Sequence, residues 1–393
     1  MAKNKRWLLP DGVEEILPAQ ARQLEQLRRE LLDLYQSWGY ELIIPPFIEY
    51  LDSLLTGTGT ALDLNTFKLI DQLSGRLLGV RADMTPQAAR IDTHRLQREA
   101  PSRLCYLGTV LHTRPDGFSG SRSPMQIGAE LFGHAGVESD VEILELMLET
   151  LSVTGIDDIH VDLGHVGIFR GLAATAGLDE EQETTLFDAL QRKAVPEIND
   201  FLAGLELAEA HRKGLAQLAD LNGGEEIFEQ AQAVLRDCGD AANTAFENLH
   251  EITALLRKRR PDADLNFDLA ELRGYHYQTG VVFAAFVAEH GQEIARGGRY
   301  DMIGREFGQA RPATGFSADL RTLMTLGERA PVRPDAIYAP HRDDVRLVEK
   351  IRRLRNDGEI VISELPGQKV VLAEVGCNRV LRWDGENWQV ENL

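Results

Sequence analysis

The N-terminal hydrophobic pattern has the spacing of a helix. Between Pro18 and Trp38 the leucines recur at intervals of three and four residues, at Leu24, Leu27, Leu31 and Leu34. Proline suits the first turn of a helix, and a glycine, Gly39, follows the last apolar position. The segment therefore predicts an amphipathic helix that packs its leucine face on a core.

Short apolar runs bounded by turn residues follow this helix and predict strands. The predicted strands are 40–44, 77–80, 104–112 and 125–132. A second helix is expected after Ser139, whose hydroxyl can cap it, with Glu142 completing a capping box. The first part of the core is therefore predicted to be a sheet with flanking helices.

A change of pattern predicts an insertion. Charged, alanine-rich helical periodicity prevails from Leu163 to Pro261. The basic run at its end, 257–260, is typical of the last turn of a helix, where the helix dipole favours cations. We therefore expect helices at 164–262, inserted into a discontinuous core of residues 1–330.

Sheet character returns after the insertion. Strands are predicted at 264–270 and 277–289, then a glycine turn at Gly297 and Gly298 and a helix at 317–327. Residues 331–393 follow the pattern strand, helix, strands, and Asp384 and Gly385 supply the turn of a hairpin. This last segment predicts a small C-terminal α/β domain.

The net charge of the chain excludes some classes of function. The 393-residue chain has a formal net charge of −20, whereas nucleic-acid binders normally present a basic surface to phosphates. No run approaches the roughly 18–20 apolar residues of a membrane span, and the first ten residues lack the apolar core of a signal peptide. We therefore expect a cytoplasmic protein that binds neither tRNA nor a membrane. The three cysteines and the histidines have no metal-ligand spacing, so no metal or other cofactor is expected.

Several blocks occur in an order that resembles histidyl-tRNA synthetases. Residues 38–49 are similar to motif 1 of class II aminoacyl-tRNA synthetases, and 104–133 to motif 2. Residues 273–283 resemble the family's histidine-specific block, and 297–301 with 315–316 resemble the approach to motif 3 and its start. The resemblance implies an α+β fold with a class II synthetase-like core, an antiparallel sheet flanked by helices, and a homodimer through motif 1.

The resemblance also implies a histidine pocket. Asp83 corresponds to the family's acid for the amino group, and Thr85 is its neighbour. Gln126 and Glu130 have even spacing on the second motif 2 strand, so both side chains face one side of the sheet. By resemblance, Gln126 contacts the histidine backbone and Glu130 its ring.

Three further residues complete the expected site. Arg273 matches the family's essential arginine, Tyr277 matches a tyrosine of its YY pair, and Arg122 is retained in the motif 2 loop. The expected histidine-binding residues are therefore Asp83, Thr85, Arg122, Gln126, Glu130, Arg273 and Tyr277.

Departures from the family affect the ATP site. His112 stands where motif 2 has an arginine, and an imidazole cannot supply the planar fork of a guanidinium. In motif 3, Asp319 replaces a glycine and Thr322 the phosphate-binding arginine. Arg321 lies one residue before the position of that arginine, which turns its side chain by about 100° around a helix axis. We therefore expect that productive ATP binding is lost.

This combination resembles the regulatory subunits of the short-form ATP phosphoribosyltransferase. The resemblance implies a non-catalytic subunit that forms a hetero-octamer with the short catalytic subunit. It also implies that the subunit is needed for catalytic activity in the first step of histidine biosynthesis, and that L-histidine is its allosteric ligand. The segment after Pro334 is also shorter than an anticodon domain of about 100 residues.

Two enzyme alternatives stay open. An active histidyl-tRNA synthetase would show pyrophosphate exchange that depends on histidine and ATP. A tRNA-independent relative that activates another amino acid is the other alternative. Gln278, in place of the second tyrosine of the YY pair, leaves room for a different ring pocket.

Overall fold

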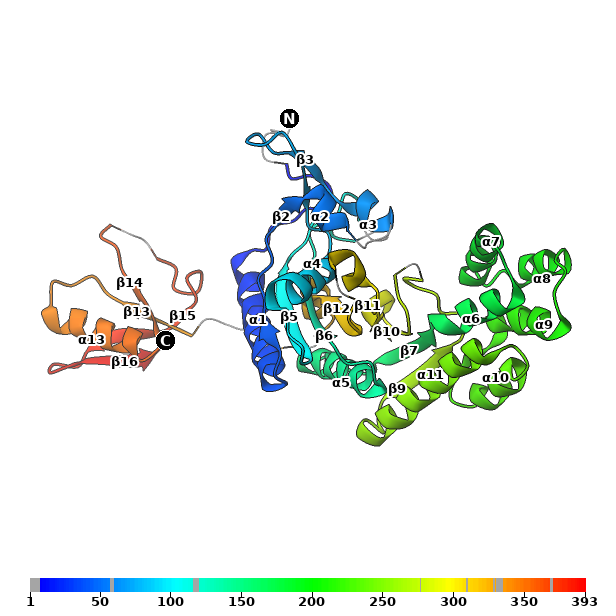
Figure 1. The fold of residues 1–393 in the computed structure, drawn as a ribbon. Coiled ribbons are helices and arrows are strands. Elements are labelled where there is room, and N and C mark those ends of the chain that lie inside the picture. Colours follow the sequence, from blue (N-terminus) through cyan, green and yellow to red (C-terminus); the bar gives the residue numbers. More distant parts are fainter. Residues whose placement is uncertain are drawn as a thin grey trace, which may run out of the picture. The chain divides into compact units, whose positions relative to one another are not determined.

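The computed structural model describes residues 8–56, 60–115, 120–275, 277–308, 310–327, 329, 335–367 and 370–393. The chain forms two compact units, Met1–Arg329 and Ala330–Leu393 (Figure 1).

The first unit contains the helices α1 to α12 and the strands β1 to β12. Its helices are α1 (Pro18–Ser37), α2 (Leu51–Leu55), α3 (Thr60–Asn65), α4 (Thr85–Ile91), α5 (Val137–Val153), α6 (Val166–Ala176), α7 (Glu180–Gln191), α8 (Val195–Ala203), α9 (Glu209–Gln217), α10 (Ile227–Leu235), α11 (Asp240–Arg259) and α12 (Leu320–Leu326). Its strands are β1 (Glu41–Leu42), β2 (Ile48–Tyr50), β3 (Lys68–Ile70), β4 (Leu77–Val80), β5 (Ser102–Thr109), β6 (Met125–Phe132), β7 (His160–His165), β8 (Asn222–Gly223), β9 (Asp264–Asp268), β10 (Val281–Val287), β11 (His290–Arg299) and β12 (Ala313–Asp319).

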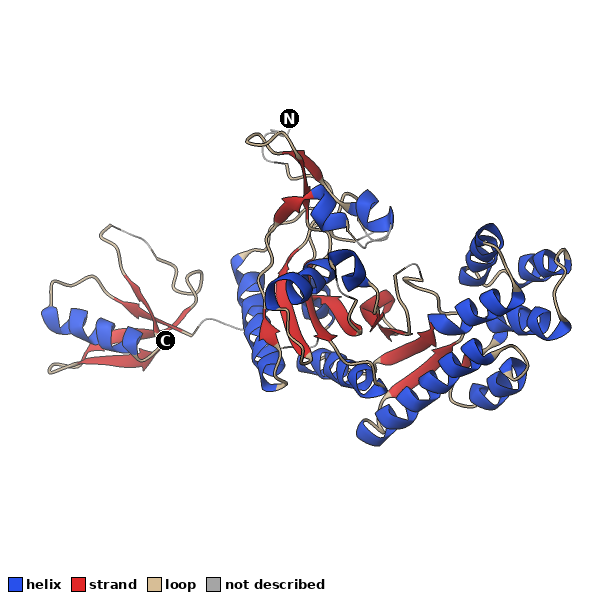
Figure 2. Cartoon of the chain, viewed as in Figure 1, coloured by secondary structure: helices blue, strands red, loops and turns tan. Residues whose placement is uncertain are grey.

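A nine-stranded sheet in the order β1-β5-β6-β12-β11-β10-β7-β9-β8 forms the centre of this unit. Its pairs are antiparallel except β1–β5 and β7–β9. The apolar side chains of α1 and α5 pack on one face, and those of α4 pack on the other. The predicted α+β class, a large sheet flanked by helices, is confirmed (Figure 2).

The predicted N-terminal helix is α1, and Pro18 occupies its first turn. Leu24, Leu27 and Leu31 are buried on its inner face together with Tyr35. The three- and four-residue spacing of these side chains places them on one stripe of the helix, which explains why the pattern predicted this element closely.

The helix predicted after Ser139 exists as α5, but its predicted cap is wrong. Gly136 is the N-cap, and the Ser139 hydroxyl donates to the Gly136 carbonyl instead of accepting from the helix. Ser139 also accepts a hydrogen bond from Arg299, and Glu142 pairs with Arg103. Tertiary partners therefore take both side chains of the expected capping box.

The predicted glycine turn and the start of the following helix are also wrong. Gly297 and Gly298 lie inside β11, and the chain reverses earlier, between Val287 and His290. Residues 317–319 end β12, so helix α12 begins only at Leu320. Both glycines pair with β12, which leaves no place for a turn there.

Helices α6 to α11 lie between β7 and β9 in the sequence and gather at one end of the sheet (Figure 1). The basic run closes α11, as predicted, with Arg257, Lys258 and Arg259 in the last turn. The segment is not wholly helical, because β8 pairs with β9 and extends the sheet.

The second unit holds β13 (Ala336–Ala339), α13 (Val345–Asn356), β14 (Ile360–Ser363), β15 (Cys377–Trp383) and β16 (Trp388–Asn392). These strands form a sheet in the order β14-β13-β15-β16. The predicted hairpin turn is present, and the Asp384 carboxylate accepts from the backbone N–H of Glu386 and of Asn387. Among the helices of the described ranges, none is both long enough and apolar enough to span a membrane.

Candidate functional site

Glu130 is the centre of a buried polar cluster on the face of the sheet that carries α4. Its side chain is on β6 and only 1% exposed. Tyr106 on β5 donates a hydrogen bond of 2.8 Å to Oε1, and Tyr300, next to the end of β11, donates to Oε2. Burial raises the pKa of Glu130 to about 8; the two phenol hydrogen bonds oppose this rise, and the Asp83 carboxylate adds to it.

Gly315 makes room for the Glu130 carboxylate. It is the β12 partner of Glu130 in the sheet register. A Cβ atom at this position would lie 1.6 Å from Oε2 of Glu130, far inside van der Waals contact. The missing side chain therefore lets the carboxyl group extend over the neighbouring strand.

A second set of contacts joins Asp83 to Gln126. The Gln126 amide donates 2.7 Å to the Asp83 carboxylate and accepts 2.9 Å from the Met84 backbone N–H. Asp83 also accepts from the backbone N–H of Thr85, 3.0 Å away, at the start of α4. Gln126 and Glu130 face the same side of β6, as their even spacing predicts.

Thr85 connects the two sets. Its hydroxyl oxygen is 3.1 Å from that of Tyr106. Because the Tyr106 proton goes to Glu130, the Thr85 hydroxyl is the donor to Tyr106. Asp83 and Gln126 are half-buried while Thr85 and Glu130 are buried, so one side of the cluster is closer to solvent than the other.

Tyr277 packs beside the cluster. Its ring centroid is 5.4 Å from that of Tyr300, with the planes tilted by 30°. Burial raises the pKa of Tyr277 well above its ordinary value, and the Glu130 and Asp83 carboxylates add to this rise. Of the seven expected residues, the structure brings together Asp83, Thr85, Gln126, Glu130 and Tyr277.

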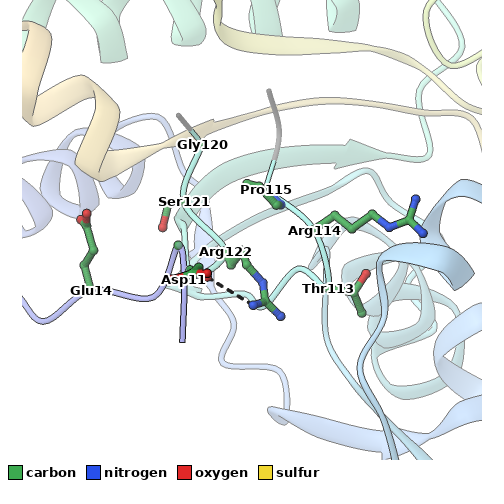
Figure 3. A pocket seen from close by; sticks show the side chains of 9 residues that line it. Asp11, Glu14, Thr113, Arg114, Pro115, Gly120, Ser121 and Arg122 are labelled. Carbon is green, nitrogen blue, oxygen red and sulfur yellow. Dashed lines mark hydrogen bonds between the residues drawn. The ribbon is translucent and has the colours of Figure 1, made fainter. Parts of the chain in front are cut away.

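Arg122 lies apart from this cluster, on a cavity of about 450 Å³ near the N-terminal segment. Its guanidinium donates to the carbonyl of Asp11 (Figure 3) and to that of His112. Its own backbone N–H donates to the Gly12 carbonyl. The N-terminal segment thus holds Arg122 in this structure.

Arg273 also points to other partners. Its guanidinium is 3.5 Å from the Glu271 carboxylate and 4.0 Å from that of Glu293, and it lies over the ring of Phe286. The side chain is 43% exposed. The structure therefore places Arg273 beside Phe286 of β10, where it pairs with two acids and not with the Glu130 cluster.

The residues that depart from the synthetase pattern have protein partners. Asp319 caps α12 through the Arg321 backbone N–H and accepts from the backbone N–H of Met125. Arg321 forms an ion pair of 2.7 Å with Glu14. The His112 ring is 2.9 Å from the Ala82 carbonyl. Asp319 therefore uses the helix N-terminus that could otherwise face an anion.

Tyr106 and Tyr300 are site residues that the sequence analysis missed. Tyr106 lies in an apolar run, which is typical of a core position, and Tyr300 lies between Arg299 and Asp301. The sequence contains no signal that either hydroxyl reaches Glu130. Tyr300 follows Arg299, which is 7% exposed and paired with the buried Asp140. That ion pair fixes the end of β11 and so the position of Tyr300.

Comparison with known families and proteins identifies the family of the chain. Residues 12–323 match the family described as histidyl-tRNA synthetase, and 334–391 match the ATP phosphoribosyltransferase subunit HisZ C-terminal domain. A protein of Thioalkalivibrio sulfidiphilus named ATP phosphoribosyltransferase regulatory subunit is 56% identical over the full length of both chains. The chain belongs to the family of ATP phosphoribosyltransferase regulatory subunits. A second member of this family, from Alkalilimnicola ehrlichii, is 57% identical over 100% of this chain and 98% of its own.

Solved structures show the same fold for this regulatory-subunit family member. A Bacillus halodurans protein described as an ATP phosphoribosyltransferase regulatory subunit/histidyl-tRNA synthetase superposes with a TM-score of 0.84 at 26% identity, covering 97% of this chain and 99% of that one. Histidyl-tRNA synthetase from Nostoc sp. PCC 7120 has a TM-score of 0.77 at 18% identity, with coverages of 96% and 91%, and shows the fold alone. The synthetase-like match includes the Glu130 cluster, and the C-terminal match coincides with the second unit.

Proposed function

We propose that this regulatory subunit senses L-histidine at the Glu130 cluster and passes the signal to the catalytic subunit of a short-form ATP phosphoribosyltransferase. The buried Glu130 carboxyl, reached by two phenols and bordered by Asp83 and Gln126, is the observation that carries the proposal. It offers an acceptor for an imidazole N–H inside the protein, with a second carboxylate nearby for an ammonium group.

The order of burial supports one orientation of the amino acid. Asp83 and Gln126 are half-buried and suit the ammonium and carboxylate, which keep part of their hydration. Glu130 is buried and suits the less polar ring. We therefore place the backbone of histidine at the Asp83 side and its imidazole at the Glu130 side.

In this function the chain itself catalyses no reaction. Arg321 is neutralised by Glu14, and Asp319 places a carboxylate at the start of α12, where a triphosphate would be repelled. The subunit is proposed to act in histidine biosynthesis by activating the catalytic chains and by conveying feedback inhibition, in a cytoplasmic hetero-octamer. Pyrophosphate exchange dependent on histidine and ATP would instead establish a working synthetase.

Loss of inhibition without loss of assembly tests this function. The complex is reconstituted from the catalytic subunit and either the wild-type chain or Glu130→Ala, and phosphoribosyl-ATP formation is followed against L-histidine. We expect Glu130→Ala to assemble and activate normally and to lose inhibition by at least about tenfold, which corresponds to about 1.4 kcal/mol of binding free energy. Glu209→Ala, an exposed acid of the helical insertion, is the matched control. A fully inhibitable Glu130→Ala complex contradicts the proposal.

We also propose a homodimer through the motif 1 region. Large apolar side chains are exposed along β1 to β4 and the segments between them, and these are Leu42, Ile44, Phe47, Ile48, Tyr50, Leu64, Leu69, Ile70, Leu73 and Leu77. Many large apolar side chains exposed within one stretch of the chain are typical of an interface. Sedimentation should show Ile44→Asp, at a side chain 84% exposed, as a monomer, while Val345→Asp in the second unit stays dimeric. An unchanged dimer for Ile44→Asp would place the interface elsewhere.

A further inference from the structure

The Glu130 cluster holds two carboxyl groups, and no arginine or lysine of the described ranges forms an ion pair with either of them. Asp83 accepts from the Gln126 amide, and Glu130 accepts from two phenols. The two arginines expected in the site, Arg122 and Arg273, have partners elsewhere. An amino acid brings a carboxylate, and removing it from water beside two acids without a cation is unfavourable. The site therefore needs another cation.

Arg81 carries a buried guanidinium without an acidic partner among the described residues. Its side chain is 7% exposed. Its Nε donates 3.0 Å to the Thr109 carbonyl, and its Nη1 donates 2.8 Å to the Pro45 carbonyl. Burial lowers the pKa of Arg81. An arginine has about five N–H donors, and Nη2 of Arg81 makes no hydrogen bond to any described residue. The guanidinium therefore keeps free donors for an anion.

The free end of this guanidinium lies beside the Gln126 side chain. A Cβ atom at Gly108 would be 2.5 Å from Nη2 of Arg81, so Nη2 takes the space that a side chain on this glycine would fill. Gly108 pairs with Gln126 across β5 and β6. Paired residues of neighbouring strands face the same side, roughly 5 Å apart. Because Gln126 and Glu130 share one face of β6, Nη2 lies on the face of the Glu130 cluster, next to the contact between Gln126 and Asp83.

We propose that Arg81 binds the α-carboxylate of the amino acid through Nη2, while Asp83 binds the ammonium group. This inference rests on the proposed histidine-sensing function and adds the cation of the site. The hydrogen bonds to the Thr109 and Pro45 carbonyls hold the guanidinium in place before a ligand arrives, so little side-chain entropy is lost on binding. The site therefore distinguishes an amino acid from an amine that carries the same ring.

L-Histidinol tests recognition of the carboxylate without any mutation. It keeps the ring and the amino group of histidine and has a neutral alcohol in place of the carboxylate. Isothermal titration of the wild-type chain compares the two ligands. We expect histidinol to bind about 10- to 100-fold more weakly, because a charge-assisted hydrogen bond is lost and a buried cation stays unpaired. A wild-type chain that binds histidinol as tightly as histidine overturns the proposal.

Arg81→Met assigns this preference to Arg81. Methionine supplies an unbranched apolar stem without a charge. We expect histidine to bind about 10- to 100-fold more weakly to the variant and histidinol to bind within about threefold of wild type, so that the preference is lost. If Arg81 only held the Thr109 and Pro45 carbonyls, its removal would weaken both ligands equally. An unchanged ratio of the two affinities therefore contradicts the proposal.

Arg212→Met is the matched control. Its guanidinium also donates to backbone carbonyls, those of Leu202 and Leu205, in the helical insertion. Both affinities of this variant should stay at the wild-type values.

Gly108→Ala tests the same contact with Arg81 still present. The added Cβ would be 2.5 Å from Nη2 and must displace the end of the guanidinium. We expect the preference for histidine over histidinol to fall by at least about tenfold. This variant also decides the question if thermal unfolding shows that Arg81→Met does not fold. A folded Gly108→Ala chain with the wild-type preference overturns the proposal.

The outcomes separate this inference from the function on which it rests. A wild-type chain that fails to bind histidine contradicts the proposed function itself. A wild-type chain that binds histidine, with the same preference over histidinol in Arg81→Met, contradicts only the role of Arg81.

Discussion

The hydroxyl of Tyr300 donates to the carboxyl of Glu130, although 170 residues separate the two in the sequence. Tyr106 donates to the other oxygen of the same carboxyl. The three side chains come from β5, β6 and the end of β11, so they meet only when the central sheet has formed. The acceptor proposed for the histidine ring is thus built by the fold as a whole.

The contribution of Glu130 to the free energy of unfolding should fall as pH rises from about 4.5 to about 8. Burial raises the pKa of Glu130 from 4.5 to about 8, so within this window the folded chain binds a proton that the unfolded chain has lost. Stabilisation from the protonated carboxyl is therefore complete below pH 4.5 and lost through pH 8. Urea unfolding of wild type and Glu130→Gln at pH 6 and pH 8.5 measures the effect. The difference between the two pH values should be smaller for Glu130→Gln; equal differences would mean that Glu130 ionises freely.

Histidine affinity should be greatest between about pH 6.5 and pH 8. Free imidazole has a pKa of about 6.5, and the pKa of Glu130 is raised to about 8 by burial. Between these values the ligand is neutral and Glu130 is protonated, so the ring and the carboxyl share one proton in their hydrogen bond. Binding must release a proton at lower pH and take one up at higher pH, and it weakens in both directions. Titrations at pH 5.5, 7.2 and 9 check this, and an affinity that rises steadily with pH would contradict it.

Much of the secondary structure could be predicted because it follows from the local periodicity of apolar residues. β4 and β6 have the bounds that their apolar runs predict, and α1 follows its leucine stripe. The even spacing of Gln126 and Glu130 likewise predicted their shared face. These features depend on residues close together in the sequence, which is where patterns are informative.

The wrong predictions arise where residues far away in the sequence determine the local structure. Ser139 is not a cap because Arg299, 160 residues away, uses its hydroxyl. Gly297 and Gly298 were expected in a turn because the strand that pairs with them was not visible in the sequence. Tyr106 has the pattern of a core residue, whereas Tyr300 lies between two charged residues, and only the assembled sheet shows that both hydroxyls reach Glu130.

Gly315→Ala should abolish histidine binding. The new Cβ would stand 1.6 Å from Oε2 of Glu130 and must displace the carboxyl from its site over β12. We expect affinity to drop by at least about 100-fold and the chain to lose about 1–3 kcal/mol of stability from overpacking. Calorimetric titration and thermal unfolding measure the two effects.

Gly291→Ala is the control for this substitution. Gly291 lies near the start of β11, and a Cβ there has nothing within 4 Å among the described residues. Its affinity and stability should stay near those of wild type. A Gly315→Ala chain with wild-type affinity would show that the Glu130 carboxyl is not held in its observed place.

Asp319→Ala should destabilise the chain without restoring ATP binding. Asp319 caps α12 and also accepts from Met125, so its removal should lower the free energy of unfolding by about 1 kcal/mol or somewhat more. Arg321 remains paired with Glu14, and His112 cannot replace a guanidinium. Thr325→Ala, at an exposed position of the same helix, is the control. Measurable ATP binding by Asp319→Ala would mean that this carboxylate alone closes the nucleotide site.

Calorimetric titration of the purified chain with L-histidine, and separately with ATP, tests the central claim most directly. The account predicts histidine binding to the wild-type chain, loss of that binding in Glu130→Ala, and no ATP binding to either. Tight binding of both ligands, or histidine binding that survives in Glu130→Ala, would contradict a histidine sensor at the Glu130 cluster.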